Sequence, residues 1–250
     1  MTGTLFNHRS IRKYKTDTVE ASKLDIILEA AIRASNTGNM QAYSIVVSRD
    51  IGIREKLWEA HFKQNMVLEA PVHLTFCADF NRFSKWCEQR KADPGYDNYL
   101  SFLTGAIDAI IAAQNAVIAA ESLGLGICYL GTATWMAAKM IEILDLPKLV
   151  VPVTAIVVGY PDEAQPLTDR LPVEGVVHFE KYQDYTAADI DRIHTEKESL
   201  ESTLELLRIN GKETLAQIFT DNRYKRADNR YFSGAFLDVL EKQGFMYNDD

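Results

Sequence analysis

The chain has 250 residues, a formal net charge of −8 and a pI of about 5.2, with 47% hydrophobic and 25% charged residues. This composition is typical of a soluble globular protein and excludes a largely disordered chain. The acidic balance argues against broad nucleic-acid binding, which needs a basic face, but it allows a small anion to bind in a local basic pocket.

The three cysteines, Cys77, Cys87 and Cys128, show neither CxxC nor Cys/His metal-ligand spacing. A disulfide framework and a metal site are therefore not expected, and a reducing cytoplasm fits. The first ten residues contain no apolar core of signal-peptide length. The longest apolar stretch, residues 106–120, includes polar side chains and is expected to be too short and too polar to span a membrane.

Periodicity predicts alternating helices and strands. Helical spacing predicts a helix over residues 22–34 with Ser22 as its cap, ending at the turn formers 36–39. The apolar and alanine-rich residues 104–123 predict a buried helix that ends at Gly124 and Gly126. The other expected elements are strands 44–50, 72–79, 126–131 and 151–161 and helices 51–60 and 135–144.

From residue 187 onward the sequence is charged, helical in pattern and poor in strand formers. We therefore expect an α+β fold of mixed α/β layers in two parts: a core over residues 1–185 and a helical C-terminal extension over 186–250. The extension is expected to pack on the core and on a partner subunit.

Several catalytic motifs are missing from the sequence. No GxGxxG follows a strand, no complete P-loop occurs, and neither GxSxG nor HExxH is present. The five histidines are scattered, and His73, on an apolar strand, is interpreted as a core residue rather than a ligand. If the protein is an enzyme, a cofactor is expected to supply its reactive group.

Four polar segments are not explained by their local structure: HRSIR at 8–12, NTGNMQ at 36–41, YLGT at 129–132 and LTDRLP at 167–172. Arginine and serine side chains are common phosphate ligands, so the first segment is a candidate anion site. Each segment alone has a simpler interpretation: a solvated surface run, a helix C-cap, or a surface cation at Arg170.

In this order and spacing, the four segments resemble the nitroreductase family of FMN enzymes, in the branch of NADPH-dependent nitroreductases and flavin reductases with an HRSIR start. The resemblance covers residues 8 to about 182, with further matching stretches FCADFNR, AQNAVIAAESLGLG and, in the tail, LDVLEKQGF. It implies a central, mostly antiparallel sheet flanked by helices. It also implies a homodimer with two FMN sites at the subunit interface and a tail that embraces the partner.

The resemblance implies roles for individual residues. The phosphate and the polar edge of the flavin ring would be held by His8, Arg9, Ser10 and Arg12, and Arg170 would also bind the phosphate. The flavin would be lined by Asn36, Gly38, Gln41 and Gln64, with Tyr129, Leu130, Gly131 and Thr132 forming the turn beneath the ring. Two positions depart from the branch: Thr168 stands where it usually has lysine, and Thr132 where it usually has a second glycine.

The implied function is an FMN-dependent NAD(P)H oxidoreductase that reduces nitroaromatics, quinones or free flavin by ping-pong hydride transfer. No acid or base residue is obligatory; Arg12 and Gly131 would tune the flavin. Two alternatives stay open: a flavin-binding protein with little turnover, and a regulatory protein that binds another phosphometabolite. The tail cluster Arg223, Lys225, Arg226 and Arg230 is either a solvated surface or a site for the 2′-phosphate of NADPH.

Overall fold

The computed structural model describes residues 2–247, which form two compact units. The first contains the chain up to Pro166 together with the residues from Ser233 onward, and the second is Leu167–Phe232. The predicted division between a core and an extension at 185/186 stays a prediction. Elements of the first unit are α1 (Thr2–Phe6), α2 (Ala21–Ile32), a 3₁₀ turn (Thr37–Asn39), β1 (Tyr43–Ser48), α3 (Ile51–Ala60), α4 (Met66–Glu69), β2 (Val72–Asp79), α5 (Asn81–Gln89), α6 (Tyr99–Ser122), β3 (Gly126–Leu130), α7 (Thr132–Trp135), α8 (Ala137–Ile143) and β4 (Val150–Gly159).

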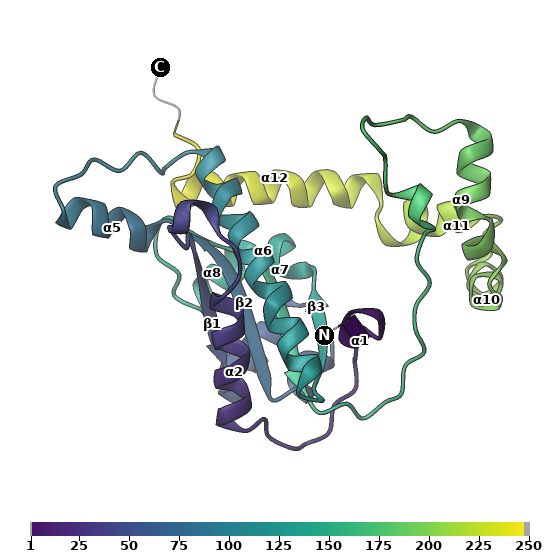
Figure 1. Cartoon of the computed structure of the whole chain (residues 1–250), viewed down its shortest axis with the longest axis horizontal. Helices are drawn as coiled ribbons and strands as arrows, with labels where there is room; N and C mark the ends of the chain where they lie inside the picture. Colours follow the sequence, from purple (N-terminus) through teal and green to yellow (C-terminus); the bar gives the residue numbers. More distant parts are fainter. Residues whose placement is uncertain (1, 248–250) are drawn as a thin grey trace. The chain divides into compact units, whose positions relative to one another are not determined.

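The four strands form one sheet in the order β1-β2-β4-β3, and all three pairings are antiparallel. The pairing of Ile45 with Phe76 joins β1 to β2, and that of Ile127 with Val158 joins β3 to β4. Strands β1 and β3 are therefore the two edges of the sheet. This architecture confirms the predicted α+β class (Figure 1).

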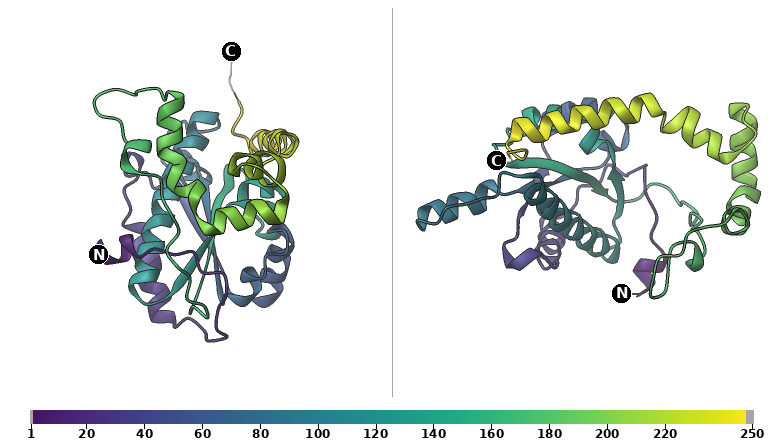
Figure 2. Two further views of the ribbon diagram at one scale, coloured as in Figure 1. Left: turned by 90° about the vertical axis from the view of Figure 1, so that its right-hand side faces the viewer. Right: turned by 90° about the horizontal axis from the view of Figure 1, so that it is seen from above.

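Helices cover both faces of the sheet (Figures 1 and 2). On one face α2 and α6 pack over Leu74 and Phe76 of β2, in a cluster that includes Ile27 and Ala113. On the other, α3, α4, α7 and α8 contribute Leu57, Met66, Ala133 and Met140. Because side chains alternate across a strand, His73 and Thr75 of β2 point into this second layer, away from Leu74 and Phe76.

Helix α6 is longer than the sequence predicted. It begins at Tyr99 because the Asn98 side chain caps it, accepting a hydrogen bond from the Ser101 N–H at 3.0 Å. Its 24 residues are long and apolar enough to span a membrane, so the expectation that this stretch is too short was wrong. Half of its most apolar window is buried in the protein, as in the core helix of a globular domain.

Three details of the sequence prediction need correction. Ser22 does not cap α2, because the helix begins at Ala21 with Glu20 at its N-cap. The helix expected over 135–144 is broken at Met136, whose φ of −115° and ψ of 27° separate α7 from α8. Gly124, at φ 77°, follows the end of α6, but Gly126 already belongs to β3.

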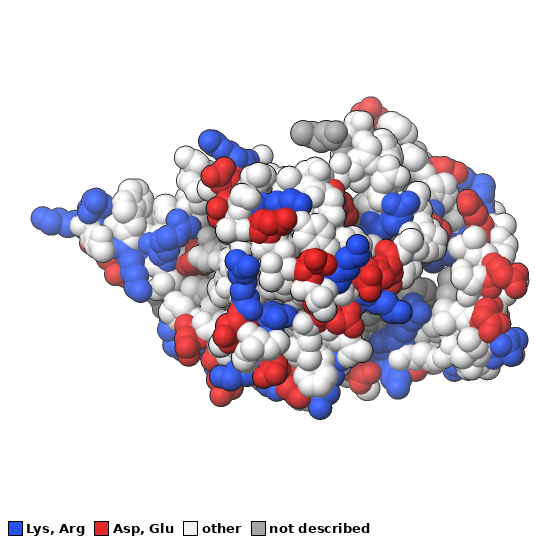
Figure 3. Space-filling model, turned by 90° about the horizontal axis from the view of Figure 1, so that it is seen from below, with Lys and Arg blue, Asp and Glu red and all other residues white. Residues whose placement is uncertain are grey.

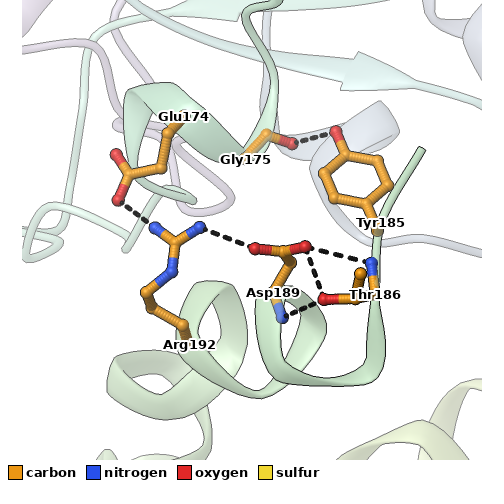
Figure 4. Close-up of polar contacts among 6 residues, drawn as sticks. All are labelled: Glu174, Gly175, Tyr185, Thr186, Asp189 and Arg192. Atoms are coloured by element: carbon orange, nitrogen blue, oxygen red, sulfur yellow. Dashed lines mark hydrogen bonds and ion pairs between the residues drawn. The ribbon is translucent and has the colours of Figure 1, made fainter. Parts of the chain in front are cut away.

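The second unit is mainly helical, as predicted for the tail. Its elements are a 3₁₀ turn (Val173–Gly175), α9 (Ala187–Ser199), α10 (Glu201–Asn210), α11 (Leu215–Gln217), a π-helical turn (Ile218–Arg223) and the start of α12 (Arg226–Gln243). Thr186 and Asp189 form a capping box that begins α9, and Arg192 bridges Asp189 and Glu174 at 3.1 and 2.9 Å (Figure 4). These contacts fix the loop before α9 onto the helix.

Charges of both signs are mixed on the surface. On the face shown in Figure 3, lysine and arginine side chains are interspersed with aspartate and glutamate.

Candidate cofactor site

The HRSIR segment lies along the outer edge of β3. Ser10 forms a parallel bridge with Ile127, and the Ile11 N–H donates to the Ile127 carbonyl at 2.8 Å. A Cβ atom on Gly126 would come within 2.7 Å of Ile11 Cγ1, so glycine at this position lets the segment approach. The basic segment is thereby fixed beside the strand that leads into the turn 129–132.

The side chains of this segment differ in how they are held. His8 Nδ1 contacts Glu121 Oε1 at 2.7 Å, and the Arg9 Nη1 donates to the Asn7 carbonyl at 3.1 Å. Arg9 Nε is buried and has no hydrogen-bond partner. Within residues 2–247 neither Arg9 nor Arg12 forms an ion pair with a carboxylate. Two guanidinium groups are thus left available for an external anion, which fits a phosphate.

The turn that follows β3 presents its residues in different directions. Leu130 is buried in the second layer, and the Tyr129 hydroxyl donates to Gln114 Oε1 at 3.3 Å. Burial raises the pKa of Tyr129 to about 12, so this phenol stays neutral. Gly131 is exposed, with no atom within 4 Å of where its Cβ would lie, and Thr132 is half-buried. Gly131 is therefore the open point of the turn.

The Thr132 side chain bonds to a buried histidine. Its Oγ1 lies 2.7 Å from His61 Nδ1, and His61 Nε2 lies 3.1 Å from His73 Nε2. Gln64, in the turn between α3 and α4, donates from its side chain to the His61 carbonyl at 3.0 Å. The structure thus joins Gln64 and Thr132, two of the predicted site residues, through one buried residue, whose backbone carbonyl bonds to Gln64 and whose ring bonds to Thr132.

The 36–41 loop is organised by Asp108 of α6. The Thr37 N–H and hydroxyl donate to Asp108 Oδ1 at 2.9 and 3.0 Å, and the Ala42 N–H donates to Oδ2 at 3.3 Å. Gly38 and Gln41 adopt left-handed φ values of 55° and 54°. The loop borders a hollow of about 590 Å³ whose lining includes Asn36, Asn39 and Gln41.

Within this chain the 36–41 loop lies apart from the basic segment. The loop leads into β1, at one edge of the sheet, whereas the basic segment adds to β3 at the other. Thr37 bonds to Asp108 and His8 bonds to Glu121, thirteen residues further along α6, about 20 Å at 1.5 Å per residue. The two groups of predicted site residues are thus not brought together in a single chain.

Arg170 and the tail arginines lie in the second unit. Arg170 Nη1 donates to Thr168 Oγ1 at 2.6 Å and to the Asp169 carbonyl at 2.8 Å. Thr168 thus holds the Arg170 side chain on its own loop. Arg223 lies 5.6 Å from the centre of the Phe219 ring, and Arg226 and Arg230 are exposed on the first turns of α12.

The family model described as "Nitroreductase family" matches residues 5–160 of this chain. This chain belongs to the nitroreductase family. Over 253 aligned residues it is 34% identical to FMN reductase [NAD(P)H] from Bacillus subtilis, covering 97% of this chain and 96% of that protein. It is also 34% identical, over 243 residues and 96% of both chains, to the oxygen-insensitive NADPH nitroreductase of Salmonella typhimurium.

A solved structure from Bacteroides fragilis is 51% identical and superposes with a TM-score of 0.96, covering 98% of this chain and all of that one. Membership of the nitroreductase family confirms the resemblance drawn from the four polar segments. The family match spans three of those segments, while Arg170 and the tail arginines lie beyond it.

Sequence reasoning missed two residues that shape this nitroreductase-family site. Asp108 was seen only as a polar interruption in an apolar helix, although a buried carboxylate there demands donors from a facing loop. His61 was counted only as one of five scattered histidines, and His73 was interpreted as a core residue; their contact joins β2 to the end of α3. The signal that could have indicated this contact was the presence of two histidines, His61 and His73, in or beside apolar elements.

Proposed function

We propose that this nitroreductase-family protein is an FMN-dependent oxidoreductase that oxidises NADPH or NADH and reduces nitroaromatics, quinones or free flavin. The observation that carries the proposal is the buried, unpartnered Arg9 Nε in a basic segment fixed on β3. A buried N–H group without a hydrogen-bond partner is costly, and a phosphate oxygen would relieve that cost. Relatives named FMN reductase and NADPH nitroreductase support the same cofactor and donor.

FMN, when bound, supplies the redox chemistry, and the protein binds and orients it. Arg9, Ser10 and Arg12 would hold the phosphate with charge-assisted hydrogen bonds. The Arg12 cation would favour extra negative charge on the ring. The open Gly131 would let the ring lie against the backbone of the turn. Because one exposed face would serve donor and acceptor in turn, ping-pong kinetics follow.

The site would be completed by a second copy of the chain. The 36–41 loop, with Asn36, Gly38 and Gln41, lies too far from the basic segment to act on the same ligand within one protomer. Helix α6 exposes an apolar stripe on either side of Asp108 along the chain, with exposed fractions of 48% at Ile107 and 49% at Ile110. Pairing of such stripes would bury them and bring each loop to the partner's basic segment.

A charge in this stripe tests the homodimer. Ile107→Glu should shift the sedimenting species from dimer to monomer and release FMN, because it places a carboxylate in an apolar contact. Glu55 is an exposed residue of α3, so Glu55→Gln is the control. It should change neither the sedimenting species nor the amount of bound FMN. A wild-type protein that sediments as a monomer with FMN bound would contradict the two-copy site.

The tail is proposed to bind the electron donor. Arg223, Arg226 and Arg230 have no carboxylate partner within the described residues, so they are available to the 2′-phosphate of NADPH. We further propose that the tail from about residue 186 forms an extension contacting the partner subunit, and that the enzyme acts in the cytoplasm. Its cysteines are buried and unpaired. Nucleic acid and membrane are not expected as partners.

Identification of the cofactor tests the proposal first. Purified protein should be yellow and release FMN, identified by mass, on denaturation. A flavin store would release FMN as well, whereas a regulatory protein binding another phosphometabolite would release a different molecule. Colourless protein that cannot be reconstituted with added FMN would overturn the proposed function.

A further inference from the structure

Four polar side chains form a continuous buried chain through the layer of α3, α4, α7 and α8. Thr132 Oγ1 lies 2.7 Å from His61 Nδ1, the two Nε2 atoms of His61 and His73 are 3.1 Å apart, and His73 Nδ1 lies 3.4 Å from Thr75 Oγ1. His61, His73 and Thr75 are fully buried. Polar groups here are costly unless they bond one another, so the chain is a specific feature of this layer.

Both histidine rings of this chain of polar side chains are neutral. Burial lowers the pKa of His61 to about 4, and burial together with the His61 and Arg54 charges lowers that of His73 well below its usual range, so both rings are neutral. One proton must lie between the two Nε2 atoms, so one ring donates there and the other accepts. The contact between Thr132 Oγ1 and His61 Nδ1 is a hydrogen bond in either arrangement, because the hydroxyl can donate or accept.

His61 also fixes the turn that contains Gln64. The Gln64 backbone N–H and side-chain amide both donate to the His61 carbonyl, at 3.3 and 3.0 Å. Between them, Phe62 and Lys63 adopt left-handed φ values of 53° and 58°, an uncommon conformation for large side chains. Such strain persists only where the surroundings impose it, and it marks functional turns.

A ring contact joins the same two turns at the surface. Phe62 packs edge-to-face against Trp135 of α7, with centroids 6.3 Å apart. The turn after α3 and the turn after β3 are thus connected twice, by the buried His61–Thr132 bond and by the Phe62–Trp135 contact.

We infer that His61, backed by His73, is a positioning residue that locks the Gln64 turn to the Gly131–Thr132 turn, so that both line one ligand. The inference rests on the proposed function, because it assigns the joined turns to the flavin. It explains why threonine can stand at 132: its hydroxyl is held inward by the hydrogen bond with His61.

Two substitutions at His61 separate positioning from simple packing. Asparagine places its amide where His Nδ1 lies and preserves the bond to Thr132. Glutamine places its amide where Nε2 lies and preserves only the contact with His73. Both leave a similar defect in the core, so their melting temperatures should fall by similar amounts. We expect His61→Asn to keep FMN affinity within about threefold of wild type and His61→Gln to lose at least about tenfold, the equivalent of one lost hydrogen bond.

Variants at Thr132, alone and combined with His61→Gln, form a double-mutant cycle that tests the same bond. Thr132→Ser keeps the hydroxyl and should bind FMN as wild type does, whereas Thr132→Val should lose affinity as His61→Gln does. The double variant Thr132→Val/His61→Gln should lose no more than the worse single variant, because the two residues act through one bond. Affinity is measured by quenching of flavin fluorescence, and the absorption spectrum of bound FMN should change in the same two single variants.

The outcomes are distinguishable. If wild type binds FMN while His61→Asn and His61→Gln lose affinity equally, in proportion to their melting temperatures, His61 is only a packing residue and the inference is overturned. Full affinity in Thr132→Val overturns it as well. If wild type itself binds no FMN, the proposed function fails and this inference falls with it.

Discussion

Thr37 and Asp108, on a loop and a buried helix face, are joined by two hydrogen bonds of 2.9 and 3.0 Å. Asp108 is 1% exposed, and both its oxygens accept from the 36–42 segment. Its charge is stabilised by these donors, as expected for a buried carboxylate. The shape of the loop therefore depends on a residue outside it.

Asp108→Asn should loosen this loop. The amide group can accept at one atom only, so one donor of the loop loses its partner at a cost of about 1–3 kcal/mol in unfolding free energy. Under the proposed function, FMN affinity should fall too. Urea unfolding and fluorescence titration measure the two effects. Asp25→Asn, on the exposed side of α2, removes the same charge and should change neither.

Arg9→Ala and Arg12→Ala should each weaken FMN retention, by about tenfold, because each removes a charge-assisted hydrogen bond to the phosphate. Lys13 and Lys15 are exposed neighbours in the same segment, and their alanine variants are the controls. Gel filtration followed by flavin absorbance measures retention. If both arginine variants keep FMN like the lysine variants, the phosphate lies elsewhere.

Arg226→Ala and Arg230→Ala, with Arg223→Ala, test the donor site. Loss of a cation that binds the 2′-phosphate should raise KM for NADPH by about tenfold and leave KM for NADH nearly unchanged. Arg208→Ala is the matched control, because Arg208 is exposed on α10 and pairs with Glu205. An unchanged preference for NADPH over NADH in all three variants would remove the assignment.

The buried histidines should make the protein sensitive to acid. The unfolded chain binds a proton at His61 near pH 6.5, and the folded chain only near pH 4. Between these values the unfolded state holds more protons, so stability falls as the pH drops from about 6.5 to 4, by about 3 kcal/mol from His61 alone. His73, whose pKa is lowered too, adds to this fall.

Urea unfolding at pH 7 and pH 4.5 measures this effect. The tryptophans, Trp58, Trp86 and Trp135, all lie in the unit that contains His61, so their fluorescence follows its unfolding. His61→Asn should be less stable at pH 7 but lose less on acidification, and His194→Asn, in the second unit, should behave like wild type. Equal acid sensitivity in wild type and His61→Asn would contradict the lowered pKa.

Much of the fold followed from local patterns. Strand β2 begins at Val72, directly after Pro71, and ends at Asp79, with the bounds that were predicted. The family, and with it the antiparallel sheet, followed from motif order. Less predictable were the bounds of individual helices. The start of α6 depends on the cap at Asn98, and the break at Met136 has no glycine or proline to announce it.

The candidate site was predictable as a set of residues but not as an arrangement. Spacing identified the segments 8–12, 36–41 and 129–132, yet it could not place two of them on opposite edges of the sheet. Nor could it reveal Asp108 or His61, since their roles come from partners 71 residues away in each case, Thr37 and Thr132. The spacing of motifs indicates which residues can bind a cofactor, whereas tertiary contacts determine which of these side chains lie together.

Anaerobic titration of the purified protein tests the central claim most directly. One equivalent of NADPH should bleach the absorbance of bound FMN, and a quinone added afterwards should restore it at the same stoichiometry. Bleaching and recovery together are the result expected of an oxidoreductase. A yellow protein whose colour NADPH does not bleach would contradict the account and leave a flavin-binding protein without turnover.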